Sequence, residues 1–209
     1  MRLVMVYHDP GDPLGHGMVE ALAHEASRRL SVPVETVTIS KLENGDYSIP
    51  EDSMVYALFL ARGGHVEVVR DAARSSGALY LGSIPPSLTG EALAAALRGC
   101  RSIALIYWPA KRFVERQRRD LEEIKSSLES ILGAPVYLRN ECSECHEDCV
   151  VPLVLMPGRL SRRVRREAGP RARVSHLLPL IQEKVLDHIE ELVMRARTAP
   201  FQGAEASLG

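Results

Sequence analysis

Two histidines in this sequence each follow a short apolar run, and imidazole is the side chain best suited to bind a metal ion or move a proton near neutral pH. His8 comes directly after the run at residues 3–7, and His65 follows the run at 54–60 and a glycine turn. Such runs predict buried parallel strands, and open sheets of this class bind ligands at the carboxyl ends of their strands. We therefore expect both imidazoles to form one site at that edge.

The first half of the chain supplies the elements that would position these histidines. Strand and helix patterns alternate four times, which predicts a parallel sheet with helices on both faces. Strands are expected at 3–7, 32–39, 54–60 and 78–81, helices at 16–30, 64–74 and 91–97, and a polar loop at 41–52.

The same order begins again after residue 100. Strands are expected at 103–107, 134–138 and 150–156, a weak strand at 174–178, and helices at 113–132, 159–168 and 180–195. Trp108 takes the place of His8 in this second series. The repeat predicts an internal duplication, with two similar lobes that each contain a parallel sheet of about four strands; a chance likeness between βα segments is the alternative. The expected parts are an N-terminal lobe at 1–100, a degenerate C-terminal lobe at 101–197 and a disordered tail at 198–209.

Composition limits the function classes. The chain has 209 residues, 45% hydrophobic and 25% charged, with a net charge of −1, which is typical of a globular protein and argues against a general nucleic-acid partner. It contains no apolar stretch of the roughly 20 residues that a membrane span requires. No signal-peptide pattern precedes the first strand, so we expect a cytoplasmic protein without a membrane partner. There is no nucleotide-binding glycine motif.

A cysteine-rich loop offers a second candidate site. Cys142, Cys145, His146 and Cys149 fall within eight residues, and this set could hold zinc or an iron–sulfur cluster. In a cytoplasmic chain, thiols or metal ligands are expected rather than a disulfide framework, although a disulfide between two of these cysteines is an alternative. The loop precedes a strand, so its expected role is structural or regulatory and not catalytic.

Motifs around both histidines resemble those of the class II chelatases, of the sirohydrochlorin cobaltochelatase and ferrochelatase (CbiX-like) type in its two-lobed form. His8 is followed by Asp12-Pro13, and Phe59-Leu-Ala-Arg-Gly-Gly-His65-Val matches a strand that ends in Phe-Leu-x-x-Gly-x-His. The loop and helix at 81–97 also look like the family's. The chain departs from the family at 9–11, where Asp-Pro-Gly replaces Gly-Ser-Arg, and its second half lacks both histidines.

The resemblance implies an enzyme, a lyase that inserts Co²⁺ or Fe²⁺, with Ni²⁺ as a further candidate, into sirohydrochlorin or a related tetrapyrrole of cobalamin or siroheme biosynthesis. His8 and His65 would bind the metal and accept pyrrole protons. Glu67 and Asp12 are candidate carboxylates that orient an imidazole or relay protons, with an ordinary solvated role as the alternative. No nucleotide is required, and a duplicated chain is expected to act as a monomer.

Sirohydrochlorin is a polycarboxylate, so the resemblance also implies a cationic cleft between the lobes. The residues expected to bind the substrate are Arg62, Gly63 and Gly64 at the first turn and Arg159 at the second, followed by Arg162, Arg163 and Arg166. The rival function is a non-catalytic tetrapyrrole- or metal-binding protein of the same fold. A redox or sensor module built on the cysteine loop is a third possibility, which leaves the histidine pattern unexplained.

Overall fold

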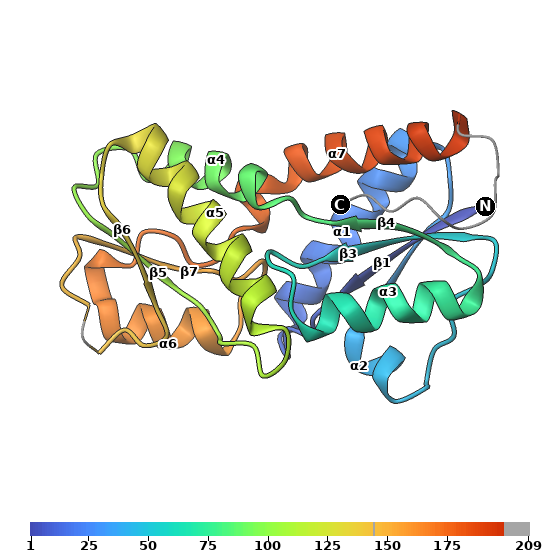
Figure 1. Ribbon diagram of the computed structural model, residues 1–209, viewed down its shortest axis with the longest axis horizontal. Helices are drawn as coiled ribbons and strands as arrows, with labels where there is room; N and C mark the ends of the chain where they lie inside the picture. The colour runs from blue at the N-terminus through green and yellow to red at the C-terminus, as the bar shows by residue number, and fades with distance from the viewer. Residues whose placement is uncertain (144, 199–209) are drawn as a thin grey trace.

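The computed structural model describes residues 1–143 and 145–198, which form two α/β lobes lying side by side (Figure 1). The first lobe contains a parallel sheet in the order β2-β1-β3-β4, and the second contains one in the order β6-β5-β7. The strands are β1 (Arg2–Tyr7), β2 (Val34–Thr38), β3 (Ser53–Leu58), β4 (Leu79–Ser83), β5 (Ile103–Ile106), β6 (Val136–Arg139) and β7 (Cys149–Pro152). The helices are α1 (Pro13–Leu30), α2 (Ile39–Glu43), α3 (Gly64–Ser76), α4 (Pro86–Ala96), α5 (Val114–Leu132), α6 (Arg159–Ala168), the 3₁₀ turn η1 (Gly169–Arg171) and α7 (Leu178–Thr198). The predicted fold class is confirmed.

The central strands of the first sheet are the apolar runs that precede the two histidines. β1 and β3 pair in parallel, with Tyr7 opposite Leu58, and every residue of β3 is buried. The order β6-β5-β7 repeats β2-β1-β3, so the internal duplication is visible in the connectivity as well as in the sequence pattern. Because paired parallel strands end at one edge, the segments after β1 and β3 are brought together.

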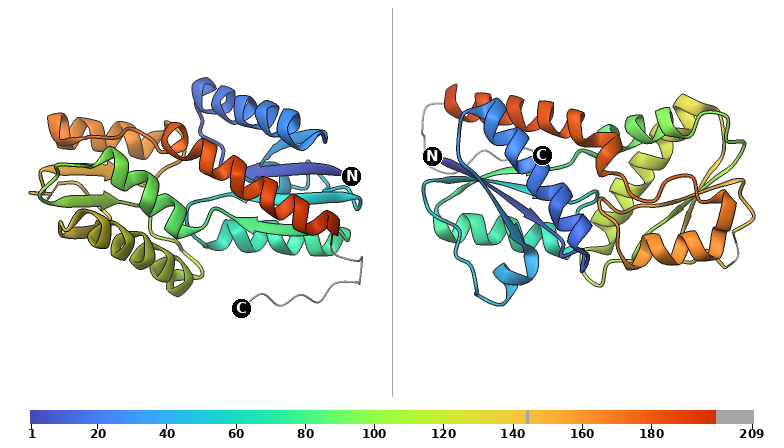
Figure 2. Two further views of the ribbon diagram at one scale, coloured as in Figure 1. Left: turned by 90° about the horizontal axis from the view of Figure 1, so that it is seen from above. Right: turned by 180° about the vertical axis from the view of Figure 1, so that it is seen from behind.

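The last helix of each half packs against the opposite half. α4 follows the first sheet in the chain but packs against α5, and α7 packs against α1 and α4. Figure 2 shows α7 extending along the first lobe. Gly90 permits the α4–α5 contact, because a Cβ there would lie 2.7 Å from the Cβ of Ser127. The domain boundary near residue 100 remains a prediction. In the folded chain, α4 packs on a helix of the second half, and α7 packs on helices of the first half.

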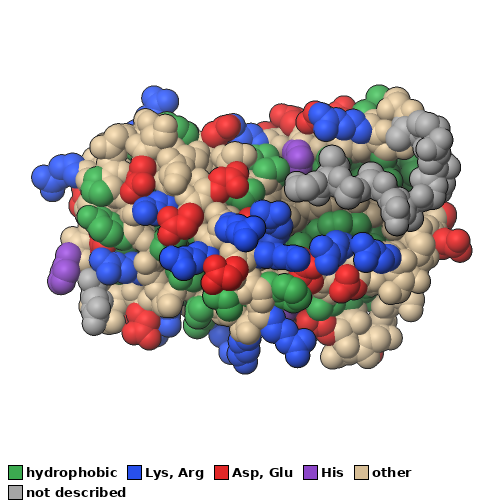
Figure 3. Space-filling view, in the orientation of Figure 1, with side chains coloured by type: hydrophobic (Ala, Val, Ile, Leu, Met, Phe, Trp, Pro, Cys, Tyr) green, Lys and Arg blue, Asp and Glu red, His purple; other side chains and the backbone are tan. Residues whose placement is uncertain are grey.

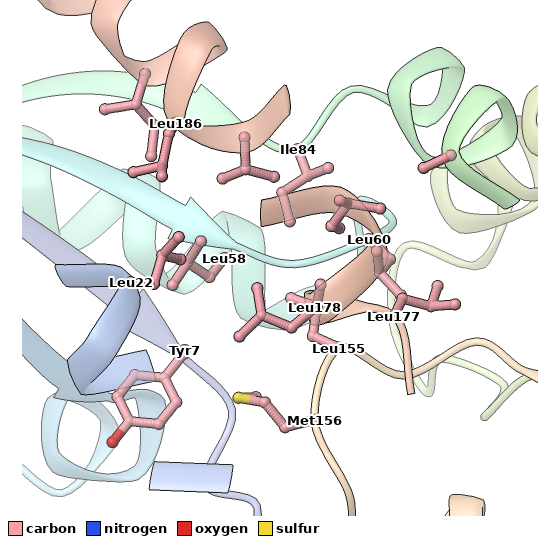
Figure 4. Packing of buried hydrophobic residues seen from close by; sticks show 14 of the residues in the cluster. Tyr7, Leu22, Leu58, Leu60, Ile84, Leu155, Met156, Leu177, Leu178 and Leu186 are labelled. Carbon is pink, nitrogen blue, oxygen red and sulfur yellow. The ribbon is translucent and has the colours of Figure 1, made fainter. Parts of the chain in front are cut away.

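A shared hydrophobic core fixes the two lobes relative to each other. Leu58 and Ile84 from the first half lie beside Leu155 and Leu178 from the second (Figure 4), and none of these side chains is more than 6% exposed. Complete burial of such side chains contributes roughly 1.5–3 kcal/mol each. The junction between the lobes is therefore an apolar interface and not a flexible linker.

Two local predictions were wrong. Helix α2 (Ile39–Glu43) forms where the sequence predicts the end of a strand at residue 39 and a loop from residue 41. The weak strand at 174–178 does not form: the backbone makes an isolated parallel bridge between Val150 and Ala172, and the amides of Leu177 and Leu178 bond beyond the end of β7. The chain turns at η1, so these scattered contacts do not form a continuous strand pairing. Among the described residues, the second sheet therefore has three strands.

The described part of the chain ends with α7. Of the predicted tail at 198–209, only Thr198 belongs to the described residues, where it is the last residue of α7. Across residues 1–143 and 145–198, no helix has the length and apolar character needed to cross a membrane.

Candidate metal centre

The structure brings His8 and His65 together at the carboxyl edge of the first sheet. His8 directly follows β1, and His65 is the second residue of α3, which begins after the glycine turn that ends β3. Their ring centroids are 5.5 Å apart and the ring planes are inclined by 76°. Both residues are exposed. Two imidazoles at this separation, open to solvent, form a site that a divalent ion can reach.

Each imidazole is oriented by a neighbour. The Nδ1 of His8 lies 2.8 Å from the carbonyl oxygen of Asp9; because a carbonyl only accepts, this bond places the proton on Nδ1 and leaves Nε2 free. The ring of His65 stacks on Phe59 at 5.9 Å between centroids, and its Nδ1 lies 3.4 Å from Oε1 of Glu43. A hydrogen bond from the second ring nitrogen to a carbonyl or carboxylate is the usual support for a histidine that ligates a metal.

Glu43 is the carboxylate of this site, and it was not among the residues predicted from the sequence. It is the last residue of α2, the short helix in the segment expected to be loop. A signal was available, since β2 is parallel to β1 and the segment after β2 must return to the edge where both histidines lie. A carboxylate shortly after the predicted second strand was therefore a candidate on topology alone.

The loop that carries His8 is fixed by a third histidine. The hydroxyl of Tyr7 lies 2.7 Å from Nδ1 of His16, and Nε2 of His16 lies 3.3 Å from Oδ1 of Asp9. The same Asp9 oxygen accepts from the amide of Gly11 at 2.8 Å. Burial raises the pKa of Tyr7, and Glu20 and Asp9 add to that rise. The Asp-Pro-Gly departure from the family's loop thus forms a compact turn around His8.

Glu67 and Arg62 join the two lobes. Glu67 is 5% exposed and forms ion pairs with Arg70 of its own helix and Arg116 of α5. The guanidinium of Arg62 bonds to Asp120 of α5, with Nη2 2.7 Å from Oδ1, and its backbone amide lies 2.5 Å from Oδ2. The hydrogen bond to Asp120 raises the pKa of Arg62. These side chains are already paired, which disfavours a catalytic role for Glu67 and substrate binding by Arg62.

Basic side chains gather in the middle of the face shown in Figure 3, where α5 meets the first lobe. At the contact between α3 and α5, Arg70 and Arg116 form ion pairs with Glu67, and Arg62, which precedes α3, forms one with Asp120. Asp12 makes a comparable link elsewhere at the junction, since it caps α1 and lies 3.1 Å from Arg162 of α6. Two of the predicted cleft arginines, Arg62 and Arg162, therefore form ion pairs between the lobes.

The glycine turns are points of close approach between the halves. A Cβ on Gly63 would lie 3.7 Å from the Cβ of Ala110, and one on Gly64 would lie 3.9 Å from the Cβ of Arg112. In the second half, a Cβ on Gly158 would lie 3.6 Å from the carbonyl oxygen of Pro10. Each turn thus contacts the loop that follows the first strand of the opposite half. Arg159, at the start of α6, and Arg166, further along the same helix, are both exposed.

The prediction of a zinc or iron–sulfur site in the cysteine loop is not supported. Cys149 forms a disulfide with Cys100, with a Cα–Cα distance of 6.0 Å, so its thiolate is not available as a ligand. Cys142 and Cys145 are buried free thiols. Burial, together with the proximity of Cys142, raises the pKa of Cys145 to about 12, which disfavours the thiolate that a metal requires. His146 is exposed.

Among the described residues, no three or more His, Cys, Asp and Glu side chains lie together in a way that could hold a metal ion. The histidine pair is thus a two-imidazole site with Glu43 supporting one ring. It is the arrangement in this part of the chain that most directly suits transient metal binding.

Comparison with solved structures identifies the architecture. The sirohydrochlorin chelatase SirB from Bacillus subtilis subspecies spizizenii, in complex with cobalt, superposes with a TM-score of 0.67 and 17% identity, over 94% of this chain and 97% of that chain. CbiX, described as the terminal enzyme for biosynthesis of siroheme in denitrifying bacteria, gives a TM-score of 0.64 and 18% identity over 94% and 99%. SirB from Bacillus subtilis with Fe³⁺ gives 0.62 and 15% over 94% and 98%.

The chain has the fold of the sirohydrochlorin chelatases. No protein-family model matches the sequence, and no curated protein matches it. The resemblance drawn from the histidine motifs is thus confirmed at the level of the fold, over nearly the whole chain. In this chelatase fold both lobes belong to one chain, and the histidine pair lies where the lobes meet.

Proposed function

We propose that this protein is a chelatase that inserts Co²⁺ or Fe²⁺ into sirohydrochlorin or a closely related tetrapyrrole. The observation that carries the proposal is the pair His8 and His65, held 5.5 Å apart between ring centroids at the sheet edge that faces the second lobe. The chelatase fold supports the reaction class, and the cobalt and iron in the similar structures support the choice of metals.

Metal insertion exchanges two pyrrole N–H protons for one divalent ion, so the protein must hold the ion without trapping it and must accept protons. Two neutral imidazoles meet both needs, because imidazole binds first-row divalent ions and titrates near neutrality. In this proposal the free Nε2 of His8 and an imidazole nitrogen of His65 bind the ion and leave its other positions to water and the incoming pyrrole nitrogens. As each pyrrole nitrogen binds the metal, its proton passes to a released imidazole or to solvent.

Glu43, rather than the predicted Glu67, is in a position to orient His65 and relay protons. Its carboxylate lies 3.4 Å from Nδ1 of His65 and is itself exposed, so it can stabilise the protonated ring and pass a proton to water. Glu67 cannot act in this way while Arg70 and Arg116 occupy its carboxylate. The lobes of a single chain supply both sides of the junction, so we retain the prediction that the protein acts as a monomer without a nucleotide.

The proposal is tested by following the absorption spectrum of sirohydrochlorin with Co²⁺ under anaerobic conditions, with and without the protein. We expect insertion to be faster than the uncatalysed reaction, and His65→Ala to return the rate to the uncatalysed level. His146→Ala is the matched control, because it removes an exposed histidine in the second lobe and should leave the rate unchanged.

Two outcomes would overturn parts of the proposal. Unchanged activity in His65→Ala would remove the histidine pair as the site. A wild-type protein that binds the tetrapyrrole or Co²⁺ but does not accelerate insertion would instead establish the rival function, a carrier built on the chelatase fold.

A further inference from the structure

Trp108 occupies in the second lobe the position that His8 occupies in the first. His8 and Trp108 each follow a tyrosine at the end of a central strand: Tyr7 is the last residue of β1, and Tyr107 comes directly after β5. Trp108 is 53% exposed and is the single tryptophan of the chain. An exposed indole offers a ligand a broad apolar face together with a polar N–H group.

The backbone around this indole is held in place. Nε2 of Gln117 donates to the carbonyl oxygen of Trp108 at 2.9 Å, and the amide of Ala110 donates to Oε1 of the same Gln117 at 2.7 Å. The guanidinium of Arg163 lies 4.9 Å from the centre of the indole ring and donates to the carbonyl oxygen of Asn140 at 2.8 Å. Arg163 covers one face of the ring, and the exposed fraction leaves the remainder open to a ligand.

The loop after Trp108 is in contact with the turn that carries His65. The Cβ of Arg112 approaches Gly64, the residue before His65, and the Cβ of Ala110 approaches Gly63. The reciprocal contact places Gly158, at the start of the helix that carries Arg163, against Pro10 in the loop of His8. The indole and the histidine pair therefore lie on opposite sides of one junction, and each is supported by the other's loop.

The loop that follows Trp108 and the helix that carries Arg163 hold cations that are not neutralised in the way that those of the lobe interface are. Lys111, Arg112 and Arg159 are exposed, and none of them, nor Arg163, has an ion pair with a carboxylate in the part of the chain that the structure describes. By contrast, the guanidinium of Arg62 is paired with Asp120. An open aromatic face beside unpaired cations suits a planar molecule with carboxylate arms.

We propose that Trp108, backed by Arg163, is a stacking platform for the tetrapyrrole plane, and that the neighbouring cations receive its carboxylates. This inference rests on the proposed function and names the wall of the substrate site opposite the histidines. It assigns the second half a binding role: the duplicated strand end that lost its imidazole holds the macrocycle while the first half holds the metal.

The test is the affinity of the full chain for metal-free uroporphyrin, a planar tetrapyrrole polycarboxylate, measured from its absorption band. Trp108→Ala should weaken binding about tenfold, because it removes the stacking surface, whereas Trp108→Phe should retain most of the affinity. Tyr137→Ala is the matched control, since Tyr137 is a 44% exposed aromatic of the same lobe with Arg139 over its ring at 5.4 Å, and it should bind as the wild type does.

The readouts separate this inference from the proposed function. Co²⁺ binding by Trp108→Ala should equal that of the wild type, because His8 and His65 are untouched. If Trp108→Ala binds uroporphyrin as tightly as the wild type, the platform is refuted while His65-dependent insertion can still stand. If Tyr137→Ala weakens binding as much as Trp108→Ala does, the effect is not specific to Trp108 and the inference fails. If the wild type binds no tetrapyrrole, both proposals fail.

Discussion

Removal of the disulfide between Cys100 and Cys149 should destabilise the protein strongly. The bond joins the segment after α4 to the first residue of β7, over a sequence separation of 49 residues. In the chain-entropy treatment a closed loop of this length restricts the unfolded ensemble by about 4 kcal/mol at 25 °C. For a chain of this size, with an unfolding entropy of about 2.1 cal/mol/K per residue, that free energy corresponds to a fall in Tm of about 9 °C.

The assay is differential scanning calorimetry of the oxidised wild type and of a Cys100→Ala, Cys149→Ala double variant, together with a thiol titration in denaturant. The unreduced wild type should show two free thiols, Cys142 and Cys145, and four after reduction. Reductant should lower the Tm of the wild type towards that of the double variant, and it should leave the Tm of the double variant unchanged.

Two results would refute this reasoning. Four free thiols in the purified, oxidised protein would show that the bond does not form. A double variant with the Tm of the oxidised wild type would show that the 49-residue loop contributes no measurable constraint, so that residual structure in the unfolded chain already restricts it.

Three further predictions follow from the site and the core. Glu43→Gln should weaken Co²⁺ binding by roughly 10- to 100-fold in calorimetric titration, because it removes the support of His65. Arg62→Ala should cost about 3 kcal/mol in urea unfolding, more than Asp120→Ala, because it leaves the 1% exposed carboxylate of Asp120 without its cation. Burial lowers the pKa of His188, so the unfolded state takes up this proton at a higher pH than the folded state does; the stability from neutral His188 is present above about pH 6.5 and is lost as pH falls below that value.

Each of these predictions has a matched control and an outcome against it. Asp46→Asn changes another exposed acid near α2, and an equal loss of Co²⁺ affinity there would argue against a specific role for Glu43. Glu123→Ala changes an exposed acid of α5 and should be neutral. His188→Gln should flatten the fall in Tm between pH 7.5 and 5.5, whereas His24→Gln, an exposed histidine of α1, should not; equal profiles would exclude burial of His188 as the cause.

The sequence was sufficient to predict the fold class and the meeting of the histidines, because both follow from buried apolar runs. Runs such as 3–7 and 54–60 have no polar face, so they must be central strands, and parallel strands bring their ends to one edge. The sequence was not sufficient to predict the surroundings of Glu67, although this residue is only two positions from His65 in the chain. On a helix that begins at Gly64, position 67 turns towards α5, where Arg116 pairs with it.

Predictions that depended on long-range partners failed for the same reason. The spacing of Cys142, Cys145 and Cys149 indicated a local metal loop, whereas Cys149 pairs with Cys100 on a segment 49 residues away. Free thiols were expected from the compartment, but the Cα atoms of Cys100, after α4, and Cys149, in β7, lie only 6.0 Å apart. Such pairings are set by the exchange of helices between lobes, and no local pattern reports it.

The charges at the junction differ between the two halves of the chain. Glu67 of α3 pairs with Arg116 of α5, while the related helices of the other half are joined by Arg162 of α6 and Asp12 at the start of α1. The sign on α3 is thus opposite to that on α6. A symmetric dimer of one lobe presents the same residue at both positions, so it could not carry this reversal. The same freedom allows an imidazole after β1 and the indole of Trp108 after β5, so the two strand ends present different side chains.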